Sequence, residues 1–370
     1  MKRLILLFVL VCAACQSGRS SATASPVSNA PTYFPTVPGF AIQSPASRTP
    51  KAVISPALTP VHPTSTLTAL PQPTTTSPTD TTAYEPYTID ALRNRAYGGG
   101  EIKIVKTMEN NDLFTRYLIR YPSDDLMIYG FVNVPKGDGP FPVIIAIHGL
   151  VDPATYQTLD YTANALDILT QYGYIVIHPN LRGYPPSDDG DNLFRVGMAV
   201  DVLNLLAMVK SRSGPEELFA NAVPENIGLW AHSMGGNIAL RVLTVSPDVK
   251  AAVLFASMSG DEQKNSELLS GSELRGPTSE IEVETPPEIV QRISPSSFYG
   301  YITASVQLQH GRVDQTIPIT WAEETCAALK AAQVETECIY YPTEDHTFRS
   351  RVSDLVYFEM SDFYETYLSP

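Results

Sequence analysis

The sequence predicts a doubly wound α/β domain whose sheet is mostly parallel, with antiparallel strands at its N-terminal end. Three observations predict it. Short β-rich runs alternate with longer helical ones from about residue 115 onward, one of the runs is apolar throughout, and a serine stands between a strand pattern and two glycines. We expect this domain to occupy residues 85–370.

An export signal is predicted at the front of the chain. Residues 1–15 begin with two basic residues, continue as an apolar run and end in Ala-Ala-Cys. The run is shorter than the roughly 20 apolar residues of a membrane-spanning helix. The ending is similar to that of a bacterial lipoprotein signal, which predicts lipidation of Cys15. Cleavage at Ala22-Thr23-Ala24, which would give a secreted protein, is the alternative, and both place the domain outside the cytoplasm.

A low-complexity segment at residues 16–84 separates the signal from the domain. It consists mostly of Ser, Thr, Pro and Ala, and 12 of the chain's 31 prolines lie between Pro26 and Pro78. Such a segment has too little apolar surface to offset the entropy of ordering. We therefore expect a disordered tether between the cell envelope and the domain.

The charge of the chain is concentrated in the domain. The formal charge is −14, and the first 84 residues hold five basic residues and one acidic residue, so the remainder carries −18. Nucleic acids and anionic lipid surfaces are bound by basic clusters. This balance excludes a nucleic-acid partner and predicts that any membrane contact is made only through a lipid anchor.

The elements of the domain follow one another in a regular order. An antiparallel hairpin is expected first, and after it a continuously apolar strand typical of burial on both faces. Helices and strands then alternate, with one polar and irregular interruption at residues 257–297. The expected elements are strands 115–121, 126–134 and 142–149, helix 161–172, strand 174–178, helix 193–210, strand 226–230, helix 235–245, strand 250–255, a strand ending at Gln309, helix 319–332, a strand ending at Tyr341 and helix 353–367.

The interruption at residues 257–297 connects two strands of the sheet and therefore passes beside their carboxyl ends. Long connections of this kind inside a compact domain are usually either functional or mobile. We expect a cap that lines an acyl pocket with its few apolar residues, Leu268, Leu269 and Ile289. A solvated surface excursion is the alternative.

The stretch G-L-W-A-H-S-M-G-G places Ser233 in a strand-to-helix turn of the x-x-S-x-G type. In such an elbow the serine hydroxyl faces a crevice at the end of a central strand. Small residues allow strand and helix to approach, and here they are Ala231, where Gly is commoner, and Gly235 with its neighbour Gly236. The alternative role of Ser233 is to cap the helix, a common use of serine.

A serine nucleophile needs a histidine base and a carboxylate that orients the histidine. In this type of fold the acid and the histidine follow the serine, each on the loop after a late strand. Asp314 and His346 occupy these two positions. Glu344 and Asp345 are competing carboxylates, but their adjacency to His346 in the chain makes them poor partners for its ring. We therefore expect a triad of Ser233, Asp314 and His346.

Acyl transfer also needs hydrogen-bond donors for the developing oxyanion. The backbone N–H of Met234, which follows the nucleophile, is one expected donor. The second is expected from the loop after the apolar strand, most simply the N–H of Leu150.

Six blocks of the sequence occur in a characteristic order: Y-G-F-V-N-V-P, P-V-I-I-A-I-H-G, H-P-N-L-R-G-Y, W-A-H-S-M-G-G, H-G-R-V-D and D-H-T-F. Together they resemble the catalytic domain of the prolyl oligopeptidase (S9) group of α/β-hydrolases, and the resemblance covers about Tyr121 to Tyr367. It implies the α/β-hydrolase fold and the triad. Members include peptidases and carboxylesterases, and the peptidases usually carry a β-propeller before the catalytic domain. Arg182 and Asp201 also match family positions, and we interpret both as structural.

These observations predict a serine hydrolase that cleaves small esters or short peptides, with carboxylesterase activity favoured. An S9-type peptidase is the alternative within the enzyme class, and a non-catalytic surface binding module is the alternative outside it. The complete triad argues against the binding module. The oligomeric state does not follow from the sequence.

Two cysteines remain in the domain, Cys326 on the late helix and Cys338 on the strand after it. In an oxidising compartment they could form a disulfide, and two buried thiols are the alternative. The domain contains no CxxC, HExxH or Gly-rich phosphate-loop motif, so we expect no metal and no cofactor.

Overall fold

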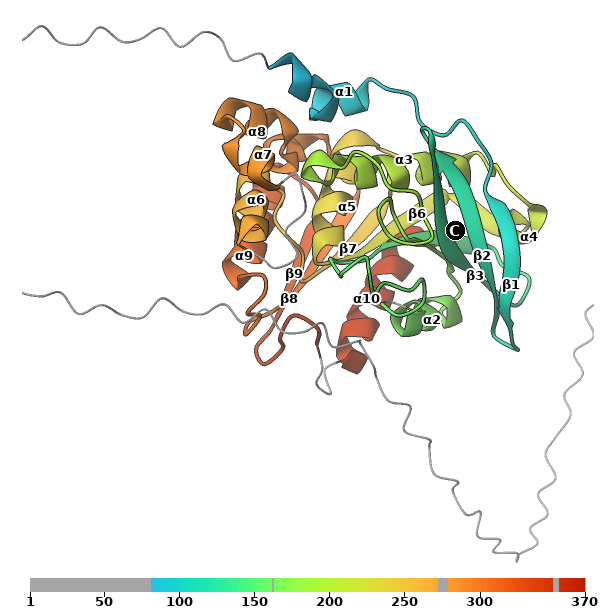
Figure 1. Cartoon of the computed structure of the whole chain (residues 1–370). Coiled ribbons are helices and arrows are strands. Elements are labelled where there is room, and N and C mark those ends of the chain that lie inside the picture. The colour runs from blue at the N-terminus through green and yellow to red at the C-terminus, as the bar shows by residue number, and fades with distance from the viewer. Residues whose placement is uncertain (1–80, 162, 272–278, 349–352, 370) are drawn as a thin grey trace, which may run out of the picture. The chain divides into compact units, whose positions relative to one another are not determined.

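The computed structural model describes residues 81–161, 163–271, 279–348 and 353–369. The predicted signal and its Cys15, and nearly all of the predicted tether, lie outside these residues. Within them the chain forms a nine-stranded sheet in the order β1-β2-β3-β5-β4-β6-β7-β8-β9, with helices on both of its faces (Figure 1). The predicted fold class, a doubly wound and mostly parallel α/β sheet, is confirmed.

The first strands are antiparallel and the later ones are parallel. β1–β2, β2–β3 and β3–β5 pair antiparallel, and every pair from β5–β4 to β8–β9 is parallel. The predicted hairpin is confirmed, because Ser123 pairs with Leu126 across its turn. The strands are β1 Lys103–Asn110, β2 Phe114–Ser123, β3 Leu126–Pro135, β4 Phe141–Ile147, β5 Ile175–Pro179, β6 Ala222–His232, β7 Ala251–Phe255, β8 Ser305–Gly311 and β9 Thr336–Tyr341.

The helices include every helix that the sequence predicted and several short ones that it did not. Among the described residues, no helix has the length and apolar character that a membrane span requires. The α-helices are α1 Ile89–Arg93, α2 Ala163–Gln171, α3 Val196–Lys210, α4 Glu216–Phe219, α5 Met234–Val245, α6 Glu262–Ser270, α7 Ser279–Glu284, α8 Pro287–Ile293, α9 Ile319–Ala331 and α10 Ser353–Leu368; the 3₁₀ helices are η1 Thr82–Tyr87, η2 Leu193–Arg195 and η3 Pro295–Tyr301.

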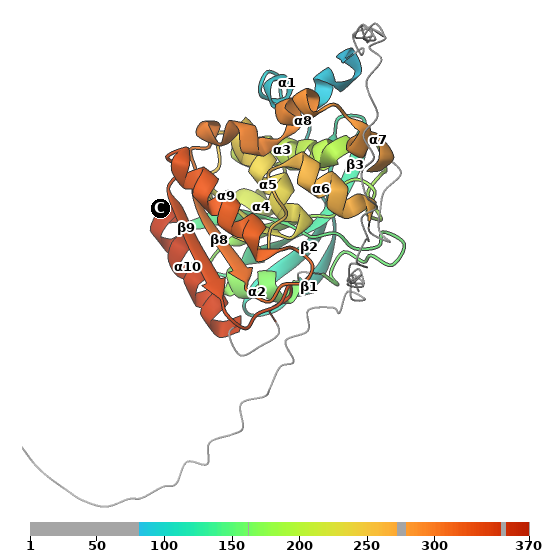
Figure 2. The same ribbon diagram turned by 90° about the vertical axis from the view of Figure 1, so that its left-hand side faces the viewer.

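The central strand β4 shows how the sheet builds a core on each face. Successive side chains of a strand point to opposite faces, so Val143, Ile145 and Ile147 join the larger core, with α3 and α5. Ile144 and Ala146 join the smaller core, with α2 and α10. Figure 2 shows α9 and α10 on opposite sides of strands β8 and β9. Because both faces of β4 are buried, its sequence is apolar throughout.

The point where the chain reverses its direction across the sheet lies between β4 and β6. From β4 the chain first adds β5 on one side and then returns to add β6 on the other. In open α/β sheets ligands bind in the crevice beyond the carboxyl ends of the strands at such a point. The residues that follow Ile147 and His232 therefore lie where a site is expected.

The segment 257–297 is helical over most of its described length, so the expectation of an irregular stretch is wrong. It forms α6, α7 and α8, and leads into η3. Ile289 packs into the larger core, and Leu268 and Leu269 pack against that core from its edge. The polar composition misled the prediction because part of this charge is buried and paired. The role of the segment as a cap stays a prediction.

Glu262, the first residue of α6, explains how a polar segment is held against the domain. Its side chain is fully buried and forms ion pairs with the guanidinium groups of Arg195 and Arg241. Asn237 on α5 donates a further hydrogen bond to the same carboxylate, at 3.0 Å. A buried charge is tolerated when it is paired and hydrogen-bonded in this way. The network ties α6 to α5, the helix that directly follows Ser233.

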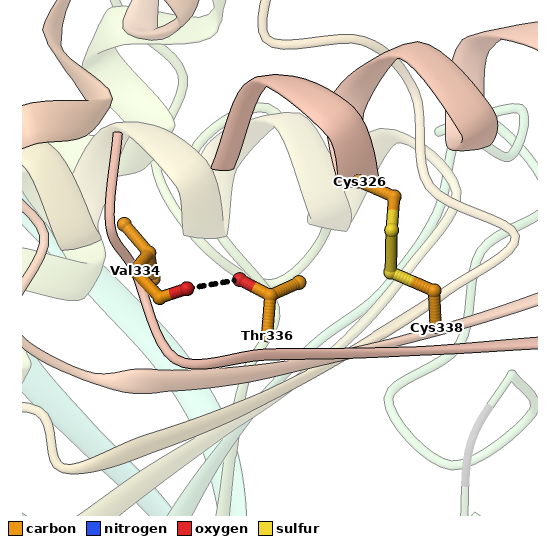
Figure 3. Close-up of a disulfide and its surroundings, with 4 residues drawn as sticks. All are labelled: Cys326, Val334, Thr336 and Cys338. Carbon is orange, nitrogen blue, oxygen red and sulfur yellow. Dashed lines mark hydrogen bonds between the residues drawn. A yellow bond between two sulfur atoms is a disulfide. The ribbon is translucent and has the colours of Figure 1, made fainter. Parts of the chain in front are cut away.

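Cys326 on α9 and Cys338 on β9 form a disulfide in the structure (Figure 3). Their Cα atoms are 6.4 Å apart, within the range that a disulfide spans. The connection between the two elements is tight, because the Thr336 hydroxyl donates a hydrogen bond to the Val334 carbonyl at 2.8 Å. Of the two alternatives for these cysteines, the structure has the bonded pair.

Candidate active site

Ser233 lies at the turn between β6 and α5 in a conformation that few residues adopt. Its backbone has φ 55° and ψ −118°, and a side chain with positive φ is normally strained. Gly235 permits this turn, because a Cβ there would lie 2.3 Å from the Ile147 carbonyl oxygen of β4. Ala231 is fully buried within β6 and pairs with Ile147. The strand and the helix therefore meet as closely as the elbow interpretation requires.

The alternative role of Ser233 as a helix cap is not supported by its contacts. Ser233 occupies the position before α5, but its side chain makes no capping hydrogen bond. Its Oγ instead lies 3.0 Å from Nε2 of His346. The hydroxyl therefore faces another side chain and leaves the helix end uncapped.

The structure brings together Ser233, His346 and Asp314, which come from the loops after β6, β9 and β8. Nδ1 of His346 lies 2.8 Å from Oδ2 of Asp314, and Nε2 of the same ring faces the serine hydroxyl. A carboxylate only accepts hydrogen bonds, so Nδ1 carries the proton and Nε2 is free to accept from the serine O–H. The His346 side chain is 14% exposed and that of Asp314 is fully buried.

Asp314 is held as an anion by the groups around it. Burial on its own would raise the pKa of this carboxyl, but hydrogen bonds from His310 and His346 and from the backbone N–H of Ile317 outweigh burial, and the pKa is lowered. Its second oxygen, Oδ1, accepts from the N–H groups of Thr316 at 2.7 Å and Ile317 at 2.9 Å. A carboxylate with a lowered pKa stays charged and keeps the histidine in one tautomer.

The neighbouring carboxylate Asp345 has a different role. Its Oδ1 accepts hydrogen bonds from the backbone N–H groups of Thr347 at 2.8 Å and Phe348 at 3.1 Å. It therefore stabilises the turn of the loop that carries His346.

Two protein-family models match the chain. Residues 216–370 match the model of the prolyl oligopeptidase family, and residues 105–260 match the model described as Chlorophyllase. The two matches together span the sheet from β1 to β9. The chain is a serine hydrolase of the α/β-hydrolase superfamily.

Individual relatives of this serine hydrolase are distant. A protein of Escherichia coli O157:H7 described as "Putative carboxymethylenebutenolidase" is 22% identical over 256 residues, which cover 61% of this chain and 80% of that protein. An acetyl xylan esterase from Paenibacillus sp. R4 superposes with a TM-score of 0.56 at 19% identity, covering 76% of this chain and 92% of that one. The acylaminoacyl peptidase of Pyrococcus horikoshii superposes with a TM-score of 0.55 at 23% identity, covering 71% of this chain but 42% of that one. At these identities the structural likeness shows the fold.

The loop after β4 runs beside Ser233. A Cβ built on Gly149 would lie 3.0 Å from Cβ of Ser233 and 2.2 Å from the hydroxyl of Tyr161. Leu150, the expected source of one oxyanion donor, follows immediately, and Met234, the expected source of the other, is the first residue of α5. Leu150 therefore lies in a loop beside Ser233, and Met234 directly follows Ser233 at the start of α5. Their role as donors stays a prediction.

Two further family positions, Arg182 and Asp201, lie in the core. The Asp201 side chain is fully buried and forms an ion pair with Arg182 at 2.8 Å, and it accepts a hydrogen bond from Ser123 at 2.6 Å. These contacts join the β5 end to α3 and β2, in agreement with a structural role. Within the described residues, no group of His, Cys, Asp and Glu has an arrangement that could hold a metal ion.

Sequence reasoning missed three residues that contact the site. His310 Nε2 lies 3.3 Å from Oδ2 of Asp314, and its spacing of four residues from that acid was the only available signal. The ring of His232 packs against that of His346, and Tyr161 hydrogen-bonds to His232. No local pattern pointed to Tyr161, which precedes α2 and is 71 residues away from His232 in the chain.

Proposed function

We propose that this hydrolase cleaves carboxylic esters through an acyl-enzyme formed on Ser233. The single observation that supports the proposal most is the His346 ring, whose two nitrogens lie 3.0 Å from the Ser233 hydroxyl and 2.8 Å from the Asp314 carboxylate. The strained backbone of Ser233 adds to this support, because such strain persists where the surrounding structure enforces it.

The proposed reaction begins with transfer of the Ser233 proton to Nε2 of His346 as Oγ attacks the acyl carbon. The backbone N–H groups of Met234 and Leu150 would hold the oxyanion of the tetrahedral intermediate. The His346 imidazolium, stabilised by Asp314, then gives its proton to the leaving alkoxide, and the acyl group stays on Oγ. A water molecule repeats the sequence, releases the acid and restores the serine.

Esters are the favoured substrates because of how this chain covers its structural neighbours. It covers 92% of the Paenibacillus acetyl xylan esterase but only 42% of the Pyrococcus acylaminoacyl peptidase. This chain therefore corresponds to nearly the whole of the esterase but to less than half of the peptidase. This correspondence in extent with an esterase supports small esters as the substrates.

Cleavage of short peptides is a second candidate. The match of residues 216–370 to the prolyl oligopeptidase family supports it, and peptidases and esterases of this type share one acyl-enzyme chemistry. The two candidates differ in the leaving group, which is an amine in one and an alcohol in the other.

The experiment that tests this proposal combines active-site labelling with a substrate panel. A fluorophosphonate should label the wild type at Ser233, and Ser233→Ala should lower ester turnover by about 10⁵-fold or more. Ser257→Ala, which removes another buried hydroxyl close to the elbow, is the matched control and should be labelled normally. Nitrophenyl esters are then compared with aminoacyl nitroanilides, and faster turnover of the anilides would favour the peptidase.

We also propose that the enzyme is exported and anchored through Cys15. The support is the sequence of residues 1–15 together with the Cys326–Cys338 disulfide, since disulfides persist mainly in oxidising compartments.

A further inference from the structure

A chain of hydrogen bonds runs behind the three residues Ser233, His346 and Asp314 and connects three loops of the site. It includes Tyr161, which precedes α2, and passes through His232, the residue before Ser233. It ends at the backbone carbonyl of His346. None of these contacts belongs to the proposed proton transfer, yet each involves a loop that the transfer depends on.

The tautomer of His232 follows from its partners. Its Nε2 lies 3.1 Å from the His346 carbonyl oxygen, and a carbonyl oxygen only accepts, so Nε2 carries the ring proton. A neutral imidazole then has a bare Nδ1, and this atom lies 2.5 Å from the Tyr161 hydroxyl. Tyr161 is therefore the donor and His232 the acceptor in that bond.

The Tyr161 oxygen is also an acceptor. Burial raises the pKa of the Tyr161 hydroxyl, and a hydrogen bond from the Gly149 backbone N–H partly offsets this effect. The hydrogen bonds therefore all run in one direction. The Gly149 N–H donates to the Tyr161 oxygen, the Tyr161 O–H donates to Nδ1 of His232, and the His232 Nε2–H donates to the His346 carbonyl. Successive hydrogen bonds of one direction polarise and strengthen one another.

His232 also forms part of the wall against which the His346 ring packs, with ring centroids 4.9 Å apart. Burial, and then the proximity of His346, lowers the pKa of His232 to about 3. A neutral His232 does not oppose the positive charge that His346 acquires when it takes the serine proton. A charged His232 at this separation would repel it.

We propose that Tyr161 and His232 are positioning residues of the acyl-transfer reaction: the His232 Nε2–H holds the His346 backbone so that its ring stays between Ser233 and Asp314, and Tyr161 fixes the required tautomer. This inference rests on the proposed function of Ser233. It adds two residues that touch no reacting atom but determine where the base lies.

The first test separates the two ring nitrogens of His232. Gln places an amide N–H close to the position of Nε2, whereas Asn reaches only the position of Nδ1. His232→Gln should keep the rate of fluorophosphonate labelling and the ester kcat close to those of the wild type. His232→Asn should lower both by about 10- to 100-fold with KM unchanged, because a displaced base costs rate and not binding. Equal rates for the two variants would overturn the proposal.

The second test removes the donor to Nδ1. Tyr161→Phe should lower kcat about 10-fold, again with KM unchanged, because the tautomer is no longer fixed. Tyr156→Phe is the matched control, since its hydroxyl bonds Asn180 at 3.2 Å from the same connection and should leave kcat unchanged. Loss of kcat in the control alone, or in neither variant, would contradict the assignment of Tyr161.

A third measurement does not depend on activity or on the folding of any variant. Nitrogen-15 NMR of the wild-type rings at neutral pH should show His232 with one proton, on Nε2. A proton on Nδ1, or on both nitrogens, would overturn the proposal. If the wild type is labelled at Ser233 and only these tests fail, the positioning role is wrong and the proposed function stands. If the wild type is not labelled, both are wrong.

Discussion

Replacement of Asp314 by Asn tests how the carboxylate controls the base. The Oδ1 of Asp314 accepts two backbone N–H groups, from Thr316 at 2.7 Å and Ile317 at 2.9 Å. The single oxygen of Asn should keep this position, because turning the amide around would place its NH₂ against two donors. The amide NH₂ would then face Nδ1 of His346.

This orientation reverses the tautomer of His346. A donor opposite Nδ1 forces the ring proton to Nε2, so the ring faces the Ser233 hydroxyl with an N–H and can no longer accept its proton. A triad altered in this way loses about 10⁴ in kcat, which corresponds to roughly 5 kcal/mol in the activation barrier. The fold should persist, since one amide replaces a carboxylate of the same shape.

The assay is single-turnover acylation with a nitrophenyl ester, together with the rate of fluorophosphonate labelling. Asp345→Asn is the matched control, because Asp345 is adjacent to His346 in the chain but its carboxylate bonds groups of its own loop. Its rate should stay within about threefold of the wild type. A variant Asp314→Asn that keeps a tenth of the wild-type rate, or a control that loses as much, would refute the role of Asp314.

The pKa of Asp314 is lowered in the folded protein, so its charged form stabilises the fold above the pKa of the unfolded chain, about 4, and this contribution is lost as the pH falls. Below that pH, chemical denaturation should show a steeper loss of unfolding free energy for the wild type than for Asp314→Asn. Parallel plots of unfolding free energy against pH for the two proteins would contradict this. Glu262→Gln leaves the buried Arg241 without its carboxylate and leaves Arg195 only its pair with Glu282 at 3.5 Å. It should lower the free energy of unfolding by about 3–5 kcal/mol, whereas Glu324→Gln, at an exposed pair, should change it by less than about 1 kcal/mol. Cys326→Ser removes a disulfide whose cysteines are separated by 12 residues and should lower the unfolding free energy by about 3 kcal/mol. A reductant should destabilise the wild type by the same amount and leave the variant unaffected. If neither protein responds to the reductant, the disulfide does not form. Cys15→Ser should move the protein from the detergent phase to the aqueous phase while Cys12→Ser does not, and identical partition of all three proteins would refute lipidation.

The sequence by itself determined the fold class and the order of the main elements. The reason is that burial and tight turns restrict the residue types of short segments. Strand β4 is buried on both faces and is therefore apolar throughout. The elbow at Ser233 needs small residues within a few positions of the serine. The positions of Asp314 and His346 followed too, because each comes directly after a predicted strand and parallel strands end at one edge.

The sequence patterns were weaker predictors for edge strand β1 and for segment 257–297. Strand β1 was not predicted, because most of its side chains are exposed and show no clean alternation. The helices of segment 257–297 were missed because its polar composition was interpreted as an irregular stretch, whereas Glu262 within it is buried. Only the tertiary structure supplies Arg195 and Arg241, which lie 67 and 21 residues away in the chain and make its burial possible.

The tertiary structure alone decided which groups contact His232 and His346. Tyr161 and His232 meet across 71 residues, and His232 reaches the His346 carbonyl across 114. The sequence around Tyr161 or His232 does not indicate these contacts. The direction in which a hydroxyl donates and the tautomer of an imidazole depend on the groups that they face. Short-range patterns describe which residues are buried and which turns are tight, whereas hydrogen bonds between distant loops exist only once the sheet has brought those loops to one edge.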